Sequence, residues 1–154
     1  MEKGTYMDTI NIGDYILQVD REKTLAFYEN YKNVCNCASC VHYRKLLKHI
    51  PKEALDLYET LGVIPGRECE IVEYGPDEKN EKLHYYEAVS GVVGTIIKLP
   101  NTTETIVSNK EQFVVEKMPK LNEVEYEFSE WFDFIPKEFP APKFAVQLFF
   151  NLPV

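Results

Sequence analysis

The stretch from Leu57 to Gly75, LYETLGVIPGRECEIVEYG, contains the point at which the chain changes from a helical to an extended pattern. Before Gly62, apolar residues recur at the three- and four-residue intervals of a helix face: Ala54, Leu57, Tyr58 and Leu61. Gly62 fits the C-cap of this helix, because glycine adopts the left-handed backbone conformation of a C-cap without steric cost. From Glu68 onward the residues have the pattern of a strand. Helices therefore precede most of the predicted strands in this chain.

Six segments after residue 67 have the composition of β-strands: 68–75, 81–89, 92–99, 111–118, 123–134 and 143–152. The polar turn GPDEKNEK at 75–82 separates the first two and favours a hairpin, and PNTTETIVSN at 100–109 predicts a second polar connection. This order indicates an α+β fold with a mainly antiparallel sheet of about five to seven strands. We expect a single domain over residues 1–154, with a helical part at about 20–62 and a sheet part at about 68–152.

The N-terminal third of the chain predicts one strand followed by helices. GDYILQV at 13–19 alternates as a strand does, and Asp20 stands where the N-cap of a first helix at 21–32 is expected. A second helix is predicted by the spacing of Tyr43, Leu46, Leu47 and Ile50. Because Pro51 fits the first turn of the next helix, the second and third helices are expected to form a hairpin.

The composition argues against nucleic-acid and membrane partners. The 154 residues include 17 basic and 25 acidic side chains, with a net charge of -8, whereas phosphate backbones are bound by clusters of Lys and Arg. No apolar run approaches the roughly 20 residues of a membrane span. The N-terminal segment also lacks an apolar core of signal-peptide length. We therefore expect a cytoplasmic protein, whose thiols stay reduced.

Three of the four cysteines, Cys35, Cys37 and Cys40, fall within the six residues CNCASC. Thiolates bind Zn²⁺ at such short spacings because the ion takes four soft donors at the corners of a tetrahedron. Two residues separate Cys37 from Cys40, which is the spacing of a metal knuckle. The cluster therefore predicts a zinc site.

The fourth ligand of this site is left open by the spacing. His42 is the nearest candidate in sequence, and we include it in the predicted site. If the helix begins before His42, however, Cys40 and His42 lie about 200° apart around the helix axis. His84 and Cys69 are alternatives, although Cys69 shares a strand face with Ile71 and fits a buried thiol.

Other interpretations of the cluster stay open. An iron–sulfur cluster is less favoured because it usually takes four cysteines. A redox-active pair at a helix N-terminus is another reading, although a thioredoxin-like C-x-x-C follows a strand in a βαβ unit. A thiol- or zinc-dependent enzyme centred on Cys37 and Cys40 is a further alternative, since catalytic zinc sites have three protein ligands. The last alternative is an apo protein with free thiols.

The segment 123–134 sets the orientation of one carboxylate. Glutamates alternate with apolar residues from Glu123 to Phe128, and continuing the alternation places Glu130 on the apolar face and Trp131 on the polar face. A β-bulge near Ser129 would reset this register. Without a bulge, Glu130 points inward, where burial would raise its pKa and make it the acid–base partner of the enzyme alternative. Trp131 would then be exposed as a ligand or subunit surface.

Three stretches carry a resemblance: CNCASC, LYETLGVIPGRECEIVEYG and FDFIPKEFPAPKFAVQLFFNLPV. On these motifs the chain resembles a family of uncharacterised bacterial and phage-borne proteins of similar length. The resemblance implies one compact domain and a shared role for Cys35, Cys37 and Cys40, and it implies no reaction. It also implies that the position of His42 varies among polar residues, which weakens His42 as a ligand.

These observations predict a small cytoplasmic zinc-binding protein that acts through protein contacts rather than as an enzyme. The predicted contact surface is formed by the aromatic residues near Trp131. Its expected partner is another protein or a second copy of this chain.

Overall fold

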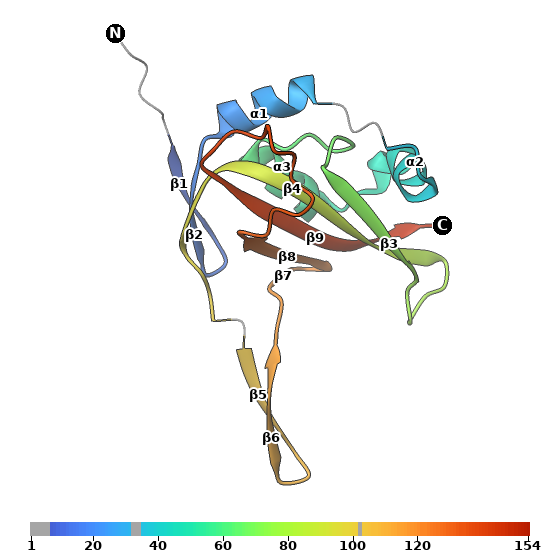
Figure 1. Cartoon of the computed structure of the whole chain (residues 1–154). Helices are drawn as coiled ribbons and strands as arrows, with labels where there is room; N and C mark the ends of the chain where they lie inside the picture. Colours follow the sequence, from blue (N-terminus) through green and yellow to red (C-terminus); the bar gives the residue numbers. More distant parts are fainter. Residues whose placement is uncertain (1–6, 32–34, 102) are drawn as a thin grey trace.

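Figure 1 shows the computed structural model of the chain, which describes residues 7–31, 35–101 and 103–154. The helices are α1 (Arg21–Asn30), α2 (Ala38–Lys45) and α3 (Lys52–Leu61), with a 3-10 helix at Leu47–His49. The strands are β1 (Asp8–Ile12), β2 (Tyr15–Val19), β3 (Glu70–Pro76), β4 (Leu83–Lys98), β5 (Thr103–Ser108), β6 (Glu111–Glu116), β7 (Lys120–Leu121), β8 (Val124–Ser129) and β9 (Lys143–Pro153). The predicted α+β class is confirmed.

The main sheet has seven antiparallel strands, within the predicted range, in the order β1-β2-β4-β9-β8-β7 with β3 also paired to β4. The 16-residue strand β4 is its centre. One edge of β4 pairs with β9 from Leu83 to Val93, while β3 and β2 share the other edge. The sequence predicted two strands here, at 81–89 and 92–99. They form one strand because the pairing with β9 continues through Ser90 and Gly91.

Helix α1 completes the edge of β4 at Gly91 and Val93, where neither β2 nor β3 is paired in the described sheet. The Tyr28 hydroxyl donates to the Gly91 carbonyl at 2.7 Å and accepts from the Gly91 amide at 2.8 Å. Thr24 Oγ1 accepts from the Val93 amide at 2.9 Å, and the Asp20 amide donates to the Val93 carbonyl at 2.9 Å. These hydrogen bonds satisfy backbone groups that burial would otherwise leave unpaired, which explains why α1 buries Thr24 and Tyr28.

The ends of the helices follow the predicted local signals. The Asp20 side chain accepts from the Lys23 amide at 3.0 Å, which confirms it as the N-cap of α1. Helix α3 buries the predicted apolar face and ends at Gly62, whose φ of 88° is left-handed. Pro51 is the N-cap of α3 rather than part of its first turn. Ile50 before it is extended, as the residue preceding a proline prefers to be.

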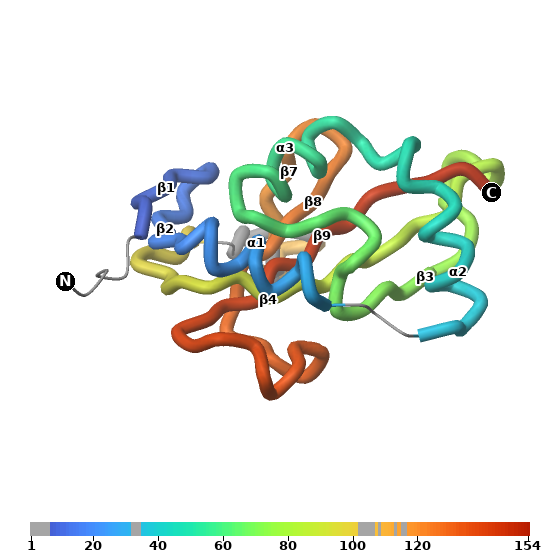
Figure 2. The backbone as a smooth tube through the Cα atoms, turned by 90° about the horizontal axis from the view of Figure 1, so that it is seen from above, coloured from blue at the N-terminus to red at the C-terminus, as the bar shows by residue number. Residues whose placement is uncertain are grey.

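The two helices that were expected as a hairpin pack against different neighbours. Helix α2 packs against β3, whereas α3 packs against α1. Seen from above in Figure 2, α3 lies on one side of the sheet and the segment 130–142 lies on the other. We call the side facing α2 and α3 the core face, and the side facing 130–142 the outer face.

Three strands of the structure fall where the sequence predicted none: β1, β5 and the two-residue strand β7. Strand β1 pairs with β2 through a two-residue turn at Gly13 and Asp14, with Gly13 at a φ of 56°. Strand β5 occupies most of the polar connection expected at 100–109, and it pairs with β6 around Asn109 and Lys110. Asn109 and Lys110 both have positive φ, as a type I′ hairpin turn requires. The β5–β6 hairpin extends away from the main sheet (Figure 1).

The predicted strand at 123–134 ends at Ser129, so both readings of Glu130 are wrong. The chain leaves the sheet after Ser129, with no bulge in its pairing to β9, and Glu130 is exposed rather than inward. Segment 130–142 then crosses the outer face, where an added Cβ at Gly91 would lie only 3.0 Å from Phe139 and 3.1 Å from Ile135. Trp131 is 37% exposed and its ring centroid lies 5.2 Å from that of Phe134, which is also exposed, whereas the contact role predicted for these rings stays a prediction.

Among the described residues, none of the helices combines the length and apolar character that crossing a membrane requires. Residues 1–6, on which the signal-peptide expectation partly rests, lie outside the described residues.

Candidate metal centre

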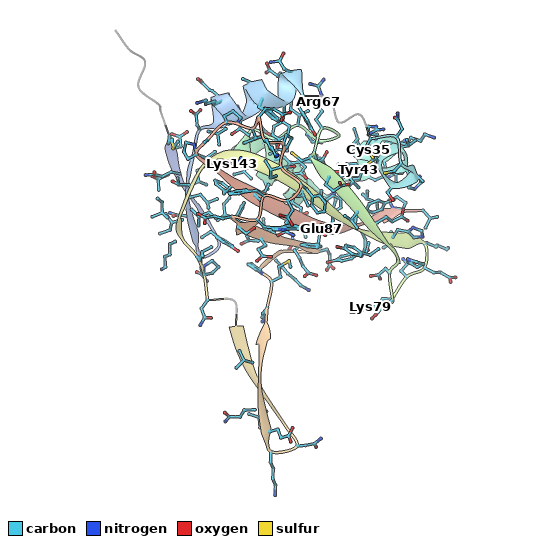
Figure 3. The ribbon with its side chains drawn as sticks, viewed as in Figure 1. Cys35, Tyr43, Arg67, Lys79, Glu87 and Lys143 are labelled. Carbon is cyan, nitrogen blue, oxygen red and sulfur yellow. The ribbon has the colours of Figure 1, made fainter. Side chains whose placement is uncertain are left out.

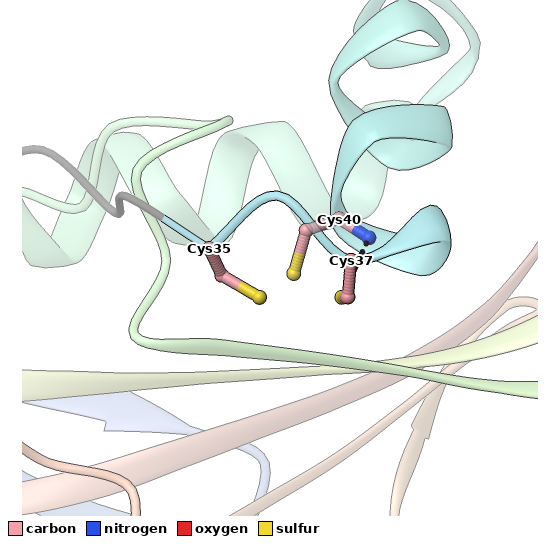
Figure 4. Close-up of side chains that lie close together, drawn as sticks. All are labelled: Cys35, Cys37 and Cys40. Carbon is pink, nitrogen blue, oxygen red and sulfur yellow. Dashed lines mark hydrogen bonds between the residues drawn. The ribbon is translucent and has the colours of Figure 1, made fainter.

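The sulfur atoms of Cys35, Cys37 and Cys40 all lie within 4.8 Å of one another (Figure 4), and they form a cluster that could hold a metal ion. In a tetrahedral zinc site with Zn–S bonds of about 2.3 Å, sulfur atoms are about 3.8 Å apart. Small side-chain movements would therefore bring all three sulfurs into bonding positions. The Cys35 side chain extends toward the side chains of Cys40 and Cys37 (Figure 4).

The start of α2 produces this convergence. Cys37 is the N-cap of α2 and Cys40 lies in its first turn, so the amide of Cys40 donates to the Cys37 sulfur at 3.4 Å. Cys35 lies two residues before the N-cap Cys37, and the Arg44 guanidinium donates to its carbonyl oxygen at 2.9 Å. Arg44 thereby joins the segment that carries Cys35 to the last turn of the helix that carries Cys40.

The three thiols differ in their exposure to solvent, and Cys37 and Cys40 differ in the pKa of their thiol groups. The hydrogen bond from the Cys40 backbone lowers the pKa of the exposed Cys37 thiol, with further contributions from the Cys35 and Cys40 side chains. Burial raises the pKa of Cys40 to about 12, reinforced by the neighbouring Cys37 and Cys35 thiols. A bound cation would instead favour the thiolate form of Cys40, because a coordinating thiol is deprotonated. The cluster is therefore open to solvent on the Cys37 side and closed on the Cys40 side.

The other predicted ligands lie outside the group of mutually close donor atoms among the described residues. Helix α2 begins before His42, so His42 and Cys40 lie on different sides of its axis, about 200° apart. His84 lies on β4 and pairs with Glu73. Cys69 is buried in the core, with its sulfur 3.7 Å from the Tyr28 hydroxyl, as its apolar strand face predicted. The choice of His42 as the fourth ligand stays a prediction.

Glu130 does not join the cysteine cluster. It lines a groove of about 470 Å³ together with residues of β2, β4 and β8, and none of the cysteines lines this groove. A pocket connecting Glu130 to the thiols would have favoured the enzyme alternative, and this groove does not provide that connection.

The sequence reasoning missed a buried carboxylate near the site. Glu68 is only 1% exposed, and it accepts hydrogen bonds from the Tyr43 hydroxyl, from the Tyr58 hydroxyl at 3.2 Å and from the Gly66 amide at 2.6 Å. Burial raises the pKa of Glu68, although these hydrogen bonds oppose the shift. Tyr43 belongs to α2 and Tyr58 to α3, so the carboxylate links the metal-site helix to the core. Figure 3 labels Tyr43 on α2.

A sequence signal for this network did exist. Tyr43 and Tyr58 both occupy apolar helix faces, and a buried tyrosine hydroxyl usually needs a hydrogen-bond partner. The position of that partner depends on how the two helices pack, which the spacing does not reveal.

No family model, no curated protein and no solved structure matches this chain. The fold and the cluster together define an α+β protein with a three-cysteine site that could hold a metal ion.

Proposed function

We propose that the protein is a cytoplasmic zinc-binding protein that acts through protein contacts and has no enzymatic activity. The observation that carries the proposal is the mutual approach of the Cys35, Cys37 and Cys40 sulfurs within 4.8 Å. Zinc is the proposed ion because it takes thiolate ligands in tetrahedral sites of this spacing. The cytoplasm is the proposed compartment because it keeps thiols reduced and able to ligate.

The ion would have a structural role. It would connect the segment before α2 to the first turn of that helix, which the Tyr43–Glu68 hydrogen bond already attaches to the core. Metal-binding free energy at such a site adds to folding free energy. The fourth ligand is proposed to be an external group on the solvent-exposed Cys37 side. His42 could take this place only if α2 began after it, whereas the helix begins at Ala38.

Two further expectations are retained as proposals. The first is membership of the uncharacterised bacterial and phage-borne family, with its single domain and shared cysteine role. The second is a contact surface at the exposed Trp131 and Phe134 rings, for a partner protein or a second copy of the chain.

A second candidate function is a thiol- or zinc-dependent enzyme centred on Cys37. It is supported by the exposure of Cys37 at the N-cap of a helix, where the amide of Cys40 stabilises a thiolate.

The test is the metal content of protein purified without added metal or chelator, measured with the melting temperature. Cys37→Ser removes one ligand while keeping a good helix N-cap. The matched control is Cys69→Ala, which removes the buried thiol outside the cluster. We expect about one zinc per chain in the wild type and in Cys69→Ala, and a loss of both zinc and thermal stability in Cys37→Ser.

Two other outcomes separate the alternatives. Zinc lost from Cys37→Ser without a change in melting temperature would favour the enzyme candidate. Wild-type protein with no metal and three titratable thiols in the cluster would overturn the zinc proposal.

A further inference from the structure

The outer face of the sheet carries a row of three aromatic rings. Tyr74 of β3, Tyr85 of β4 and Phe149 of β9 lie side by side, with ring centroids 6.1 Å and 6.0 Å apart. Their neighbours Tyr86 and Phe150 point to the core face, where both contact Tyr43 of α2. Tyr74 is 57% exposed, and Tyr85 and Phe149 are half-buried. We call these three residues the aromatic row.

Two carboxylates accept hydrogen bonds from the row. The Tyr74 hydroxyl donates to Glu87, which also accepts from Gln147 Nε2 at 2.7 Å. The Tyr85 hydroxyl donates to Glu125 of β8 at 3.4 Å. The hydrogen bond to Glu87 is the main reason why the pKa of Tyr74 is raised to about 12. Figure 3 labels Glu87 on this part of the sheet.

This combination of groups has the chemistry of a cation-binding surface. The face of an aromatic ring attracts cations, and a phenol that donates to a carboxylate has a more electron-rich ring. Arginine fits best, because its planar guanidinium can stack on a ring and also pair with a carboxylate. Basic residues of this face lie at its margins: Lys120 is opposite Glu125 on β7, and Lys143 lies over the Phe132 ring at 5.2 Å.

We propose that the aromatic row binds an arginine-containing basic segment of a partner protein, with guanidinium groups stacked on Tyr74 and Tyr85 and one of them paired with Glu125. Alternate side chains of an extended peptide are about 6.6–6.8 Å apart, close to the 6.0–6.1 Å spacing of the rings. The net charge of -8 favours association with a basic partner. The proposal gives a surface to the protein contacts of the proposed function, and it does not depend on the metal.

The test uses a fluorescently labelled hexa-arginine peptide and measures binding by anisotropy at low and at physiological salt. We expect salt-weakened binding to the wild type and to Cys37→Ser, and weaker binding of a hexa-lysine peptide because an ammonium group does not stack. Tyr74→Ala and Glu125→Gln should each weaken hexa-arginine binding by about threefold or more. Zinc content should be the same in these two variants as in the wild type.

The matched control is Glu59→Gln, which removes the same charge from an exposed position on α3. Its affinity for hexa-arginine should equal that of the wild type. If Glu59→Gln weakens binding as much as Glu125→Gln, the peptide responds only to net charge and the proposal is overturned. It is also overturned if hexa-arginine does not bind, or if Tyr74→Ala binds it as the wild type does.

An NMR measurement on the wild type locates the bound peptide without relying on variants that could affect folding. The side-chain amide of Gln147 donates to Glu87 beside the row, so its NMR resonances should shift when hexa-arginine is added. Shifts confined to other parts of the molecule would place the peptide elsewhere and contradict the proposal.

Discussion

Tyr28→Phe removes one oxygen atom from the core and should destabilise the protein strongly. In the wild type this hydroxyl donates to the Gly91 carbonyl and accepts from the Gly91 amide. Both backbone groups belong to the stretch of the β4 edge that β2 and β3 leave unpaired. Phenylalanine keeps the ring packing against Phe27 and Phe139, so the variant isolates the loss of the hydrogen bonds.

The magnitude follows from the two groups left without a partner. A buried donor or acceptor that loses its partner costs about 1–3 kcal/mol. We expect about 3 kcal/mol in total, because carbonyl oxygens tolerate the unpaired state better than amides. For a chain of this size, about 2–4 °C of melting temperature corresponds to each kcal/mol, so the melting temperature should fall by about 6–12 °C.

The assay is urea unfolding of the wild type, Tyr28→Phe and a control, Tyr126→Phe. The Tyr126 side chain is buried, but its hydroxyl makes no hydrogen bond with the residues that the structure describes. The control should therefore change the free energy of unfolding by less than about 0.5 kcal/mol. If the two variants have the same stability, the Tyr28 hydroxyl does not stabilise the fold by hydrogen-bonding the Gly91 backbone, and α1 does not complete the edge of β4 in this way.

Three other perturbations test separate parts of the structure. Burial raises the pKa of Glu68 above its ordinary value of 4.5, so the folded state favours the protonated carboxyl. The stabilisation from this shift is fully present below pH 4.5 and is lost as the pH rises through the folded-state pKa. Glu68→Gln should flatten this decline in urea unfolding measured across pH, and an unchanged slope would contradict it. Gly94→Ala should cost more than about 2 kcal/mol, because Gly94 has a φ of 155° and an added methyl group would overlap the Gln18 carbonyl oxygen of β2. Gly75→Ala, with nothing near its added methyl group, should cost only about 1 kcal/mol in thermal unfolding. Chelation of zinc should lower the melting temperature of the wild type and leave Cys37→Ser unaffected, whereas an equal response of both proteins would contradict a structural ion.

Features set by neighbours in the sequence were predicted correctly. The apolar face of α3, the Gly62 C-cap and the Asp20 N-cap all depend on residues within one or two helical turns. The cysteine cluster belongs to the same class, because the start of α2 brings Cys37 and Cys40 together over three residues. Local periodicity is sufficient for such features, since the backbone geometry of a helix fixes which side chains meet.

Features that depend on distant partners were missed or predicted wrongly. The strand ending at Ser129 was extended to residue 134 because aromatic residues continue the strand composition. Those residues instead belong to the segment that crosses the outer face, and Ile135 and Phe139 pack there against Gly91. Glu68 was missed for a related reason, since its partners Tyr43 and Tyr58 come from two separate helices.

The sequence by itself determined the change from helices to strands after Gly62, the caps at Asp20 and Gly62 and the group of cysteines that could hold a metal. Only the tertiary structure decided that Tyr28 completes the edge of β4, which lies 63 residues away, and that Tyr74, Tyr85 and Phe149 form one row across three strands. The physical reason is the range of the interactions. Helix and strand periods are set by each residue's own backbone, whereas the pairing of strands and the burial of hydroxyl groups depend on the closure of long loops.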